Sequence, residues 1–471
     1  MSETLEAHAL PYEAGENWDE AFEEGRPRPG YETLMTRLAQ ADLPALRGRL
    51  AERLAQRGVS FGPSSGPQEF VVDPVPRIIG AGEWRRVSAG LVQRARALSA
   101  FVADVYADRE IVEAGIVPAR VVESAGHFEP WMVGRPAAPL AFVAGLDLVR
   151  GADGVLRVLE DNFRTPSGMA YAAAARDELD PQLPLRAPPR ANPAAAFDLL
   201  ATTLRRAAPE CVANPFVVLL SDGPSNSAWW EHREIGRRTG IPIVTRDDLL
   251  IRRGRVHAAL QGTRTRPVDV VYRRTEEDRL CDPEGRSTWI ADALLPAVRA
   301  GTLTVVNALG SGVADDKLAH AYVEEMVRFY LSEEPLIESV PTFDLGDAAT
   351  RATVMPRLDE LVVKPRGSLG GHGVTVCRQA STEDRRRIET LIEECPEDWI
   401  AQDTVTLSTH PTVCDDGRLE PRHVDLRPYV IGAGDETCVA PVALTRVAFD
   451  AGCLVVNSSQ NGGAKDTWLP A

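Results

Sequence analysis

Lysine is nearly missing from this chain. The sequence contains 52 lysine and arginine residues, yet only Lys317, Lys364 and Lys465 are lysines. A codon bias that converts surface lysine to arginine accounts for the general pattern but not for these three, each of which lies in a polar or glycine-rich motif. A lysine ammonium is a compact charge that suits one phosphate oxygen or a purine nitrogen, whereas a planar guanidinium needs more room. The three lysines are therefore candidates for functional sites.

Other features are also absent, and each absence excludes a class of protein. The seven cysteines show no CxxC spacing and the eight histidines form no HxxxH pair, so neither a disulfide framework nor a zinc site is expected. No run of about eighteen apolar residues could cross a membrane, and the N-terminus lacks the order of a signal peptide. The formal net charge of -16 argues against a nucleic-acid partner. We expect a cytoplasmic protein with neither a membrane nor a nucleic acid as its partner.

The chain of 471 residues is too long for one simple core, so two or three lobes are expected. Residues 1–30 are acidic and rich in glycine and proline, which predicts a loosely ordered arm. Apolar residues recur at helical spacing over 32–57 and over 83–107, and these two helices are expected to form a cap or an oligomer face. A βαβ-like stretch covers 216–244, and the last third is rich in predicted strands, with one helix at 382–394. Helices and strands of this kind predict an α+β fold.

Two apolar runs around the turn at 151–154 predict a β-hairpin. With a tight turn, Asp147 would lie opposite Val158, and Asp161 would face solvent. Three polar side chains would then project from one face: Asp147, Glu160 and Asn162. Two carboxylates and an amide oxygen suit Mg²⁺, which substrate phosphates would also hold. The alternative is the polar face of an exposed hairpin.

A second element combines a lysine with glycines. The run from Leu361 predicts a strand that ends at Lys364, four glycines follow within seven residues, and another strand begins at Val374. Glycine lets backbone N–H groups turn toward a phosphate without a Cβ in the way. The element is neither a Walker A loop nor a dinucleotide fingerprint, because no helix follows it. It predicts a flap over a nucleotide, with an ordinary glycine-rich hairpin as the alternative.

Arginines also occur inside the apolar strands predicted near the C-terminus. Such arginines need anionic partners. Substrate or phosphate oxygens would serve, and so would a buried pair between Asp425 and Arg427. The polar run 457–465 is either a substrate loop or a loose tail.

These motifs together resemble those of one family. The strand-lysine-glycine flap and the Glu-x-Asn element of Glu160 and Asn162 are typical of ATP-grasp enzymes, but here they occur in reversed order. The chain therefore resembles the circularly permuted ATP-grasp proteins of type 2, relatives of the glutathionylspermidine synthase-like amide ligases. The similarity runs from about Pro74 to the C-terminus and includes Gly312-Val-Ala-Asp-Asp-Lys317 and Asp425-Leu-Arg-Pro428.

The resemblance implies an ATP-grasp fold with permuted element order and an N-terminal helical region. Its implied parts are an arm with helices (1–70), a helix with the metal-binding hairpin (71–180), an α/β lobe (181–310) and an ATP-binding lobe (311–471). It also implies a role for each matching residue. The ATP site would consist of Lys317, Lys364, the flap residues Gly367, Ser368, Gly370, Gly371 and Gly373, and Gln402 near the adenine. The Mg²⁺ ligands would be Asp147, Glu160 and Asn162, and the arginines that face an acyl-phosphate or an acceptor carboxylate would be Arg273, Arg427 and Arg446.

The implied activity is an ATP- and Mg²⁺-dependent carboxylate–amine ligase that forms an amide or peptide bond through an acyl-phosphate. Its substrates would be a small-molecule or peptide carboxylate and an amine. Two alternatives stay open: a kinase that stops at phosphorylation of a small acceptor, and a catalytically inactive nucleotide-binding regulatory protein.

Overall fold

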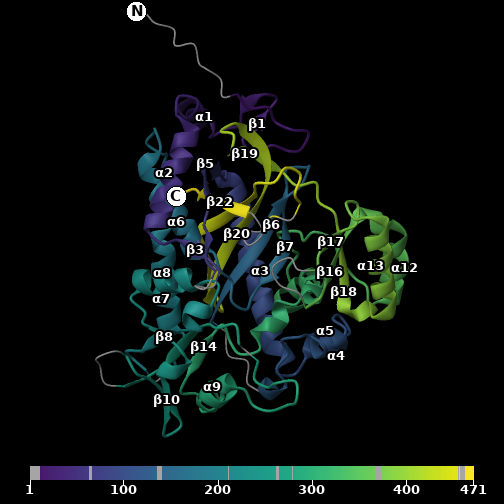
Figure 1. Cartoon of the computed structure of the whole chain (residues 1–471). Coiled ribbons are helices and arrows are strands. Elements are labelled where there is room, and N and C mark those ends of the chain that lie inside the picture. The colour runs from purple at the N-terminus through teal and green to yellow at the C-terminus, as the bar shows by residue number, and fades with distance from the viewer. Residues whose placement is uncertain are drawn as a thin grey trace, which may run out of the picture.

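A computed structural model describes residues 11–62, 66–134, 141–210, 212–260, 265–277, 279–367, 373–454, 456 and 462–471. Three larger sheets organise the chain (Figure 1). One is a large, mostly antiparallel sheet, one a parallel sheet and one a small antiparallel sheet. Among the described residues, no helix combines the length and apolar character needed to cross a bilayer.

The large sheet has seven strands in the order β5-β22-β21-β20-β6-β7, with β19 paired to β20. All neighbours are antiparallel except β22 and β5. The strands are β5 (Val72–Ile78), β6 (Ala141–Arg150), β7 (Leu156–Asn162), β19 (Thr409–Val413), β20 (Leu419–Ala433), β21 (Glu436–Ala448) and β22 (Gly462–Trp468).

Side chains alternate between the two faces of each strand, and on this sheet both faces are covered. On β6, Leu146 and Leu148 belong to the same buried cluster as helix α3 (Ala81–Val105). Val143 points to the opposite face and belongs to the cluster of α2 (Leu43–Gln56), α6 (Met169–Leu179) and α7 (Ala194–Arg206). Every residue of β6 is accordingly buried.

Helix α3 was expected in a cap or at an oligomer face, and that prediction is wrong. Leu91, Leu98 and Phe101 are fully buried in the core, and Arg94 in the same helix is only 2% exposed. The apolar stripe was correct for a helix, but a stripe does not show whether the surface that it meets belongs to the same chain.

The predicted βαβ stretch forms part of the parallel sheet, whose strand order is β14-β13-β8-β9. Helix α8 (Trp229–Thr239) connects β8 to β9 as expected. The strands are β8 (Val217–Ser221), β9 (Ile243–Val244), β13 (Val270–Arg274) and β14 (Thr304–Val306).

The small antiparallel sheet has the order β15-β18-β16-β17. Helices α12 (Ala348–Val354) and α13 (Thr382–Glu394) share a separate buried cluster with it, on the far right of Figure 1. Its strands are β15 (Thr342–Asp344), β16 (Leu361–Pro365), β17 (Thr375–Val376) and β18 (Trp399–Asp403).

The described part of the N-terminal segment, from residue 11 on, is not the loose arm that its composition predicted. It forms the short pair β1 (Phe22–Glu23) and β2 (Arg26–Pro27), followed by α1 (Glu32–Leu38). Glu20 is 6% exposed and accepts hydrogen bonds from Arg77 (2.6 Å), Arg150 (2.9 Å) and Ser408 (2.7 Å). A buried carboxylate with three partners fixes this segment to the large sheet.

The β6–β7 hairpin forms where it was expected, but its register differs. Asp147 lies opposite Glu160 rather than Val158, because a bulge in β7 shifts the pairing between Asp147 and Leu148. Strict alternation would place Glu160 on the same face as Val158, which is in the core. The extra residue reverses the alternation and turns Glu160 away from the core.

Candidate active site

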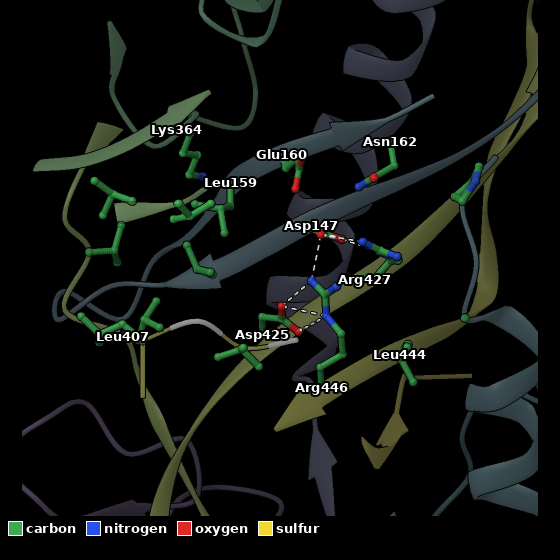
Figure 2. Close-up of a pocket in the computed structure, with 18 of the residues that line it drawn as sticks. Asp147, Leu159, Glu160, Asn162, Lys364, Leu407, Asp425, Arg427, Leu444 and Arg446 are labelled. Atoms are coloured by element: carbon green, nitrogen blue, oxygen red, sulfur yellow. Dashed lines mark hydrogen bonds and ion pairs between the residues drawn. The ribbon is translucent and has the colours of Figure 1, made fainter. Parts of the chain in front are cut away.

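A cleft of about 440 Å³ lies between the large sheet and the small antiparallel sheet. It brings together side chains from β6, β7, β16, β20 and β21 (Figure 2). Lys317 and residues of β18 also line it. The residues from the sequence prediction that line it are Asp147, Glu160, Asn162, Lys317, Lys364, Gln402, Arg427 and Arg446.

Lys364 stands on β16 and reaches the neighbouring strand β18. Its Nζ donates to Oε1 of Gln402, whose amide nitrogen in turn donates to the carbonyl of Leu159 (3.1 Å) and to the hydroxyl of Thr342 (2.8 Å). Burial lowers the pKa of Lys364 to about 8; the nearby ammonium of Lys317 acts in the same direction. The position of the amine is therefore fixed, while its charge is only marginally favoured.

Lys317 begins the short helix α10 (Lys317–His320) and faces Glu160 on β7. The Nζ of Lys317 lies 3.1 Å from Oε1 of Glu160. Burial opposes ionisation of Glu160, but Lys317 and Lys364 together hold the pKa of this carboxyl below its usual range. Glu160 is thus an anion between two ammonium groups.

Asp147 is bound by two arginines of the neighbouring strands. Arg427 donates to both of its oxygens (2.5 and 2.7 Å), and Arg446 adds a third bond at 2.8 Å. Although burial opposes ionisation, the two guanidinium groups lower the pKa of Asp147 to about 2. Asp425 accepts from Arg446, so the alternative of a buried pair between Asp425 and Arg427 is replaced by two other pairs, Arg427 with Asp147 and Arg446 with Asp425.

Positive charge is concentrated in the cleft, although it does not exceed the negative charge. Four cations, Lys317, Lys364, Arg427 and Arg446, share the cleft with four carboxylates, Asp147, Glu160, Asp403 and Asp425. Asp403 is paired with Arg357 (2.8 Å), which does not line the cleft. In a chain with a formal net charge of -16, such a site can still attract a phosphate.

The donor set on β6 and β7 fits a magnesium ion. Glu160 and Asn162 line the cleft, and the side-chain nitrogen of Asn162 is buried with no partner in the described part of the chain. Asp147 contributes less readily, because three N–H groups already bind it. Its Oδ1 accepts one of these bonds and has a lone pair to spare. Hard oxygen donors of this kind are those that Mg²⁺ prefers.

Some predicted site residues are not brought to the cleft. Arg273 is 1% exposed on β13, and it is not among the described residues that line the cleft. Gly367 and Gly373 are described but do not line it either. Ser368, Gly370 and Gly371, three of the predicted flap residues, lie outside the described residues.

Lys465, the third of the rare lysines, has a structural position instead. It is fully buried on β22, where its Nζ donates to Asp73 and to the carbonyl of Pro411. Of the polar run 457–465, residues 457–461 lie outside the described residues.

Asp161 was expected to face solvent, and that prediction is also wrong. The same bulge that turns Glu160 toward the cleft turns Asp161 into the core, where it is 2% exposed. Arg94 of α3 donates to both of its oxygens (2.6 and 2.7 Å), and His320 of α10 lies 2.6 Å away. Arg94 interrupts an apolar helical stripe, and this was the one signal in the sequence for a buried carboxylate partner.

The fold and the cleft define a class of protein. Two sheets meet at a charged cleft that has lysines on one side and carboxylates with an amide on the other, which is the arrangement expected of an ATP-grasp protein. Residues 76–448 match the model of the family described as circularly permuted ATP-grasp type 2, and the chain belongs to this family.

Relatives extend the comparison. A Frankia alni protein named "Putative glutamate--cysteine ligase 2-3" is 43% identical over 96% of this chain and 54% of its own length. An uncharacterized protein of Synechocystis sp. is 40% identical over 97% of this chain and 98% of its own length. A solved glutathione synthetase-like effector from Globodera pallida has a TM-score of 0.58 at 14% identity and covers 91% of this chain and 97% of its own, so this likeness concerns the fold alone. The chain spans about half the length of the Frankia relatives that it matches.

Proposed function

We propose that the protein is an ATP-dependent carboxylate–amine ligase that forms an amide or peptide bond through an acyl-phosphate. The observation that carries the proposal is the single cleft in which Lys317 and Lys364 face Glu160 and Asn162. Membership of the ATP-grasp family and the name of the Frankia alni relative support the same class of reaction.

The nucleotide phosphates would lie between the two lysines. The apolar side chains beside Lys364 would hold the adenine, with Gln402 near its edge. Glu160, Asn162 and Asp147 would hold Mg²⁺, which when bound supplies charge neutralisation to the phosphates. Lys364 would donate to a phosphate oxygen in place of Gln402.

An oxygen of the carboxylate substrate attacks the γ-phosphorus, and ADP leaves. The amine nitrogen then attacks the acyl carbon of the acyl-phosphate, loses a proton, and phosphate leaves with the oxygen that came from the carboxylate. Arg427 and Arg446 would stabilise the negative oxygens of both steps, because Asp147 and Asp425 hold their guanidinium planes in fixed orientations. Chemistry of this kind depends on alignment and charge, not on a protein nucleophile.

The test is a coupled assay of ADP release with pooled carboxylates and amines. A ligase requires both substrates, a kinase requires one acceptor, and an inactive nucleotide-binding protein releases no ADP with any of them. A carboxylate labelled with ¹⁸O adds a direct measurement, since a ligase that uses an acyl-phosphate transfers one labelled oxygen to phosphate. ADP release without this transfer would remove the acyl-phosphate from the proposal.

The variant Glu160→Gln tests the metal site. It keeps the shape of the side chain but removes the charge, and we expect kcat to fall by about a hundredfold or more. Glu325→Gln is the matched control, because Glu325 is exposed and pairs only with a surface arginine among the contacts described. Full activity in Glu160→Gln would show that this carboxylate does not hold the metal.

A further inference from the structure

The cleft continues past its charged centre to an aromatic wall formed by Phe61, Phe70 and Tyr171. Phe61 ends strand β3 (Ser60–Phe61), and Phe70 follows strand β4 (Gln68–Glu69), which pairs with it. Both phenylalanines precede residue 76, where the match to the family begins. This wall is therefore partly built by a segment that the shared family core does not include.

The wall is fixed in place by polar as well as apolar contacts. The ring of Tyr171, on α6, lies 4.9 Å from that of Phe70 and 6.3 Å from that of Phe61. Its hydroxyl donates to the carbonyl of Ser60 (2.9 Å), and the N–H of Gly62 donates to the carbonyl of Ser227 (2.8 Å). These bonds hold the β3–β4 pair against the helical side of the cleft.

The loop that precedes α6 connects the wall to the charged centre. Arg427 donates from Nη1 to the carbonyl of Ser167 at 3.3 Å. A Cβ placed on Gly168 would lie 2.8 Å from the side chain of Leu444, which also lines the cleft. In Figure 2, Leu444 lies on the opposite side of Asp147 and Arg427 from Lys364. The wall thus adjoins Arg427 on the side away from Lys364.

The chemistry of this end is apolar. Pro166 and Leu444 line it beside the three rings, and the polar groups among them are hydroxyls and backbone atoms. Arg427 and Arg446, which this end adjoins, are already bound by Asp147 and Asp425. A charged side chain at the rings would therefore lose its hydration and compete with these ion pairs, whereas an apolar group would gain about 25 cal/mol for each Å² that it buries.

We propose that the aromatic wall is a subsite for the side chain of the carboxylate substrate, and that this side chain is aryl or branched alkyl, not acidic. The proposal rests on the proposed ligase function for the identity of the substrate that enters. The reacting carboxylate would lie beside Arg427, with its side chain directed toward Phe61. The segment outside the family core then determines which carboxylate is chosen.

Ligand-observed NMR binding with two probes tests the subsite without turnover. The probes are 3-phenylpropionate, a carboxylate that carries an aryl group, and glutarate, a carboxylate that carries a second acidic group. We expect 3-phenylpropionate to bind the wild type at least about tenfold more tightly, and Phe61→Ala to lose about tenfold of that affinity. Phe61→Tyr keeps an aromatic ring and should retain most of it.

Phe22→Ala is the matched control, because Phe22 is also a partly exposed phenylalanine of the N-terminal segment but does not line the cleft. It should bind 3-phenylpropionate as the wild type does, and ATP affinity should be unchanged in every variant. Equal binding of the two probes, or full binding by Phe61→Ala, would overturn the subsite. A thermal melt of each variant confirms that it is folded.

A separate experiment tests the ligase proposal, so that its failure can be distinguished from failure of the subsite. Hydroxylamine traps an acyl-phosphate as a hydroxamate, and a protein that binds 3-phenylpropionate through Phe61 but yields no hydroxamate from any carboxylate would keep the subsite and lose the ligase function. Hydroxamate formation that prefers glutarate would keep the ligase function and overturn the subsite.

Discussion

Lys364 illustrates how the surroundings of a side chain change its pKa. Its ammonium is buried beside Lys317, which disfavours the charge, and beside Glu160, which favours it. The result is a pKa of about 8 in place of the usual 10.5 of a lysine. Such an amine is charged at neutral pH but close to losing its proton, so the binding of phosphate can be sensitive to pH.

We expect ATP affinity to weaken above pH 8. Only the ammonium form attracts phosphate, and its fraction in the ligand-free protein falls about tenfold between pH 7 and pH 9, which raises the apparent Kd by up to that factor. Isothermal titration calorimetry with ATP across this range measures the effect. Lys364→Met should bind more weakly and should lose this dependence. An unchanged pH profile in that variant would assign the titration to another group.

The same shift affects stability with a definite sign. Because the pKa of Lys364 is lower in the folded chain than in the unfolded chain, the unfolded chain binds more protons between pH 8 and pH 10.5. The contribution of Lys364 to the free energy of unfolding therefore rises with pH in this window. Urea denaturation at pH 7.5 and pH 10 should show a larger increase for the wild type than for Lys364→Met. An equal increase would contradict it.

The rarity of lysine was informative at the residue scale, but only in part. Lys317 and Lys364 line the cleft, whereas Lys465 pairs with Asp73 in the core. Composition shows that a residue type was retained, and a compact ammonium can be retained for a phosphate or for a buried carboxylate. The sequence around a lysine does not show which of these two partners it has, because a phosphate belongs to a ligand and the buried carboxylate lies far away in the sequence.

At the scale of the elements, the β6–β7 hairpin shows where sequence reasoning succeeded and failed. The two strands, the turn and the shared face of Asp147, Glu160 and Asn162 were predicted, but the shared face was predicted from a pairing of Asp147 with Val158 that the structure does not have. The bulge was not predicted, because nothing in the local sequence indicates which residue is extra. Asp161 lies on the face opposite Glu160, as predicted, but that face packs against the core and not against solvent.

The buried cluster behind the hairpin predicts a large effect on stability. Asp161→Asn would leave the guanidinium of Arg94 buried without its anion and should lower the free energy of unfolding by about 3–5 kcal/mol. Urea denaturation at neutral pH measures it. Asp153→Asn is the control, since the pair of Asp153 with Arg157 is partly exposed on the same hairpin and should cost less than about 1 kcal/mol. Similar losses in the two variants would contradict the role of the cluster.

At the scale of the whole molecule, the cleft exists only because distant parts of the chain meet. Glu160 belongs to the large sheet and Lys364 to the small one, and the family resemblance was what indicated their proximity. The α+β class and several strands were accessible from the sequence through periodicity, and the ATP-grasp family through motifs, whereas the pairing of the strands into three sheets was not predicted. The core position of α3 and the packing of residues 11–30 were not, because both depend on which surfaces the folded chain leaves uncovered.

A ligand shared by the two sheets should stabilise both together. At a concentration of one hundred times its Kd, Mg-ATP adds about 2.7 kcal/mol to the free energy of unfolding. Hydrogen exchange should then slow in β7 and in β16 alike. Glu160→Gln should show a smaller change in both strands. Protection confined to one strand would mean that the nucleotide contacts only one sheet.

The place of β22 has a consequence for how the chain is made. In the sheet as described, β5 is paired only with β22, which lies between it and β21. A ribosome synthesises β5 early and β22 late, so β5 has no paired strand during most of translation. Asp73 of β5 and Lys465 of β22 are directly opposite in that pairing. The pairing of β5 with the sheet and its buried ion pair can therefore form only after β22 has been synthesised.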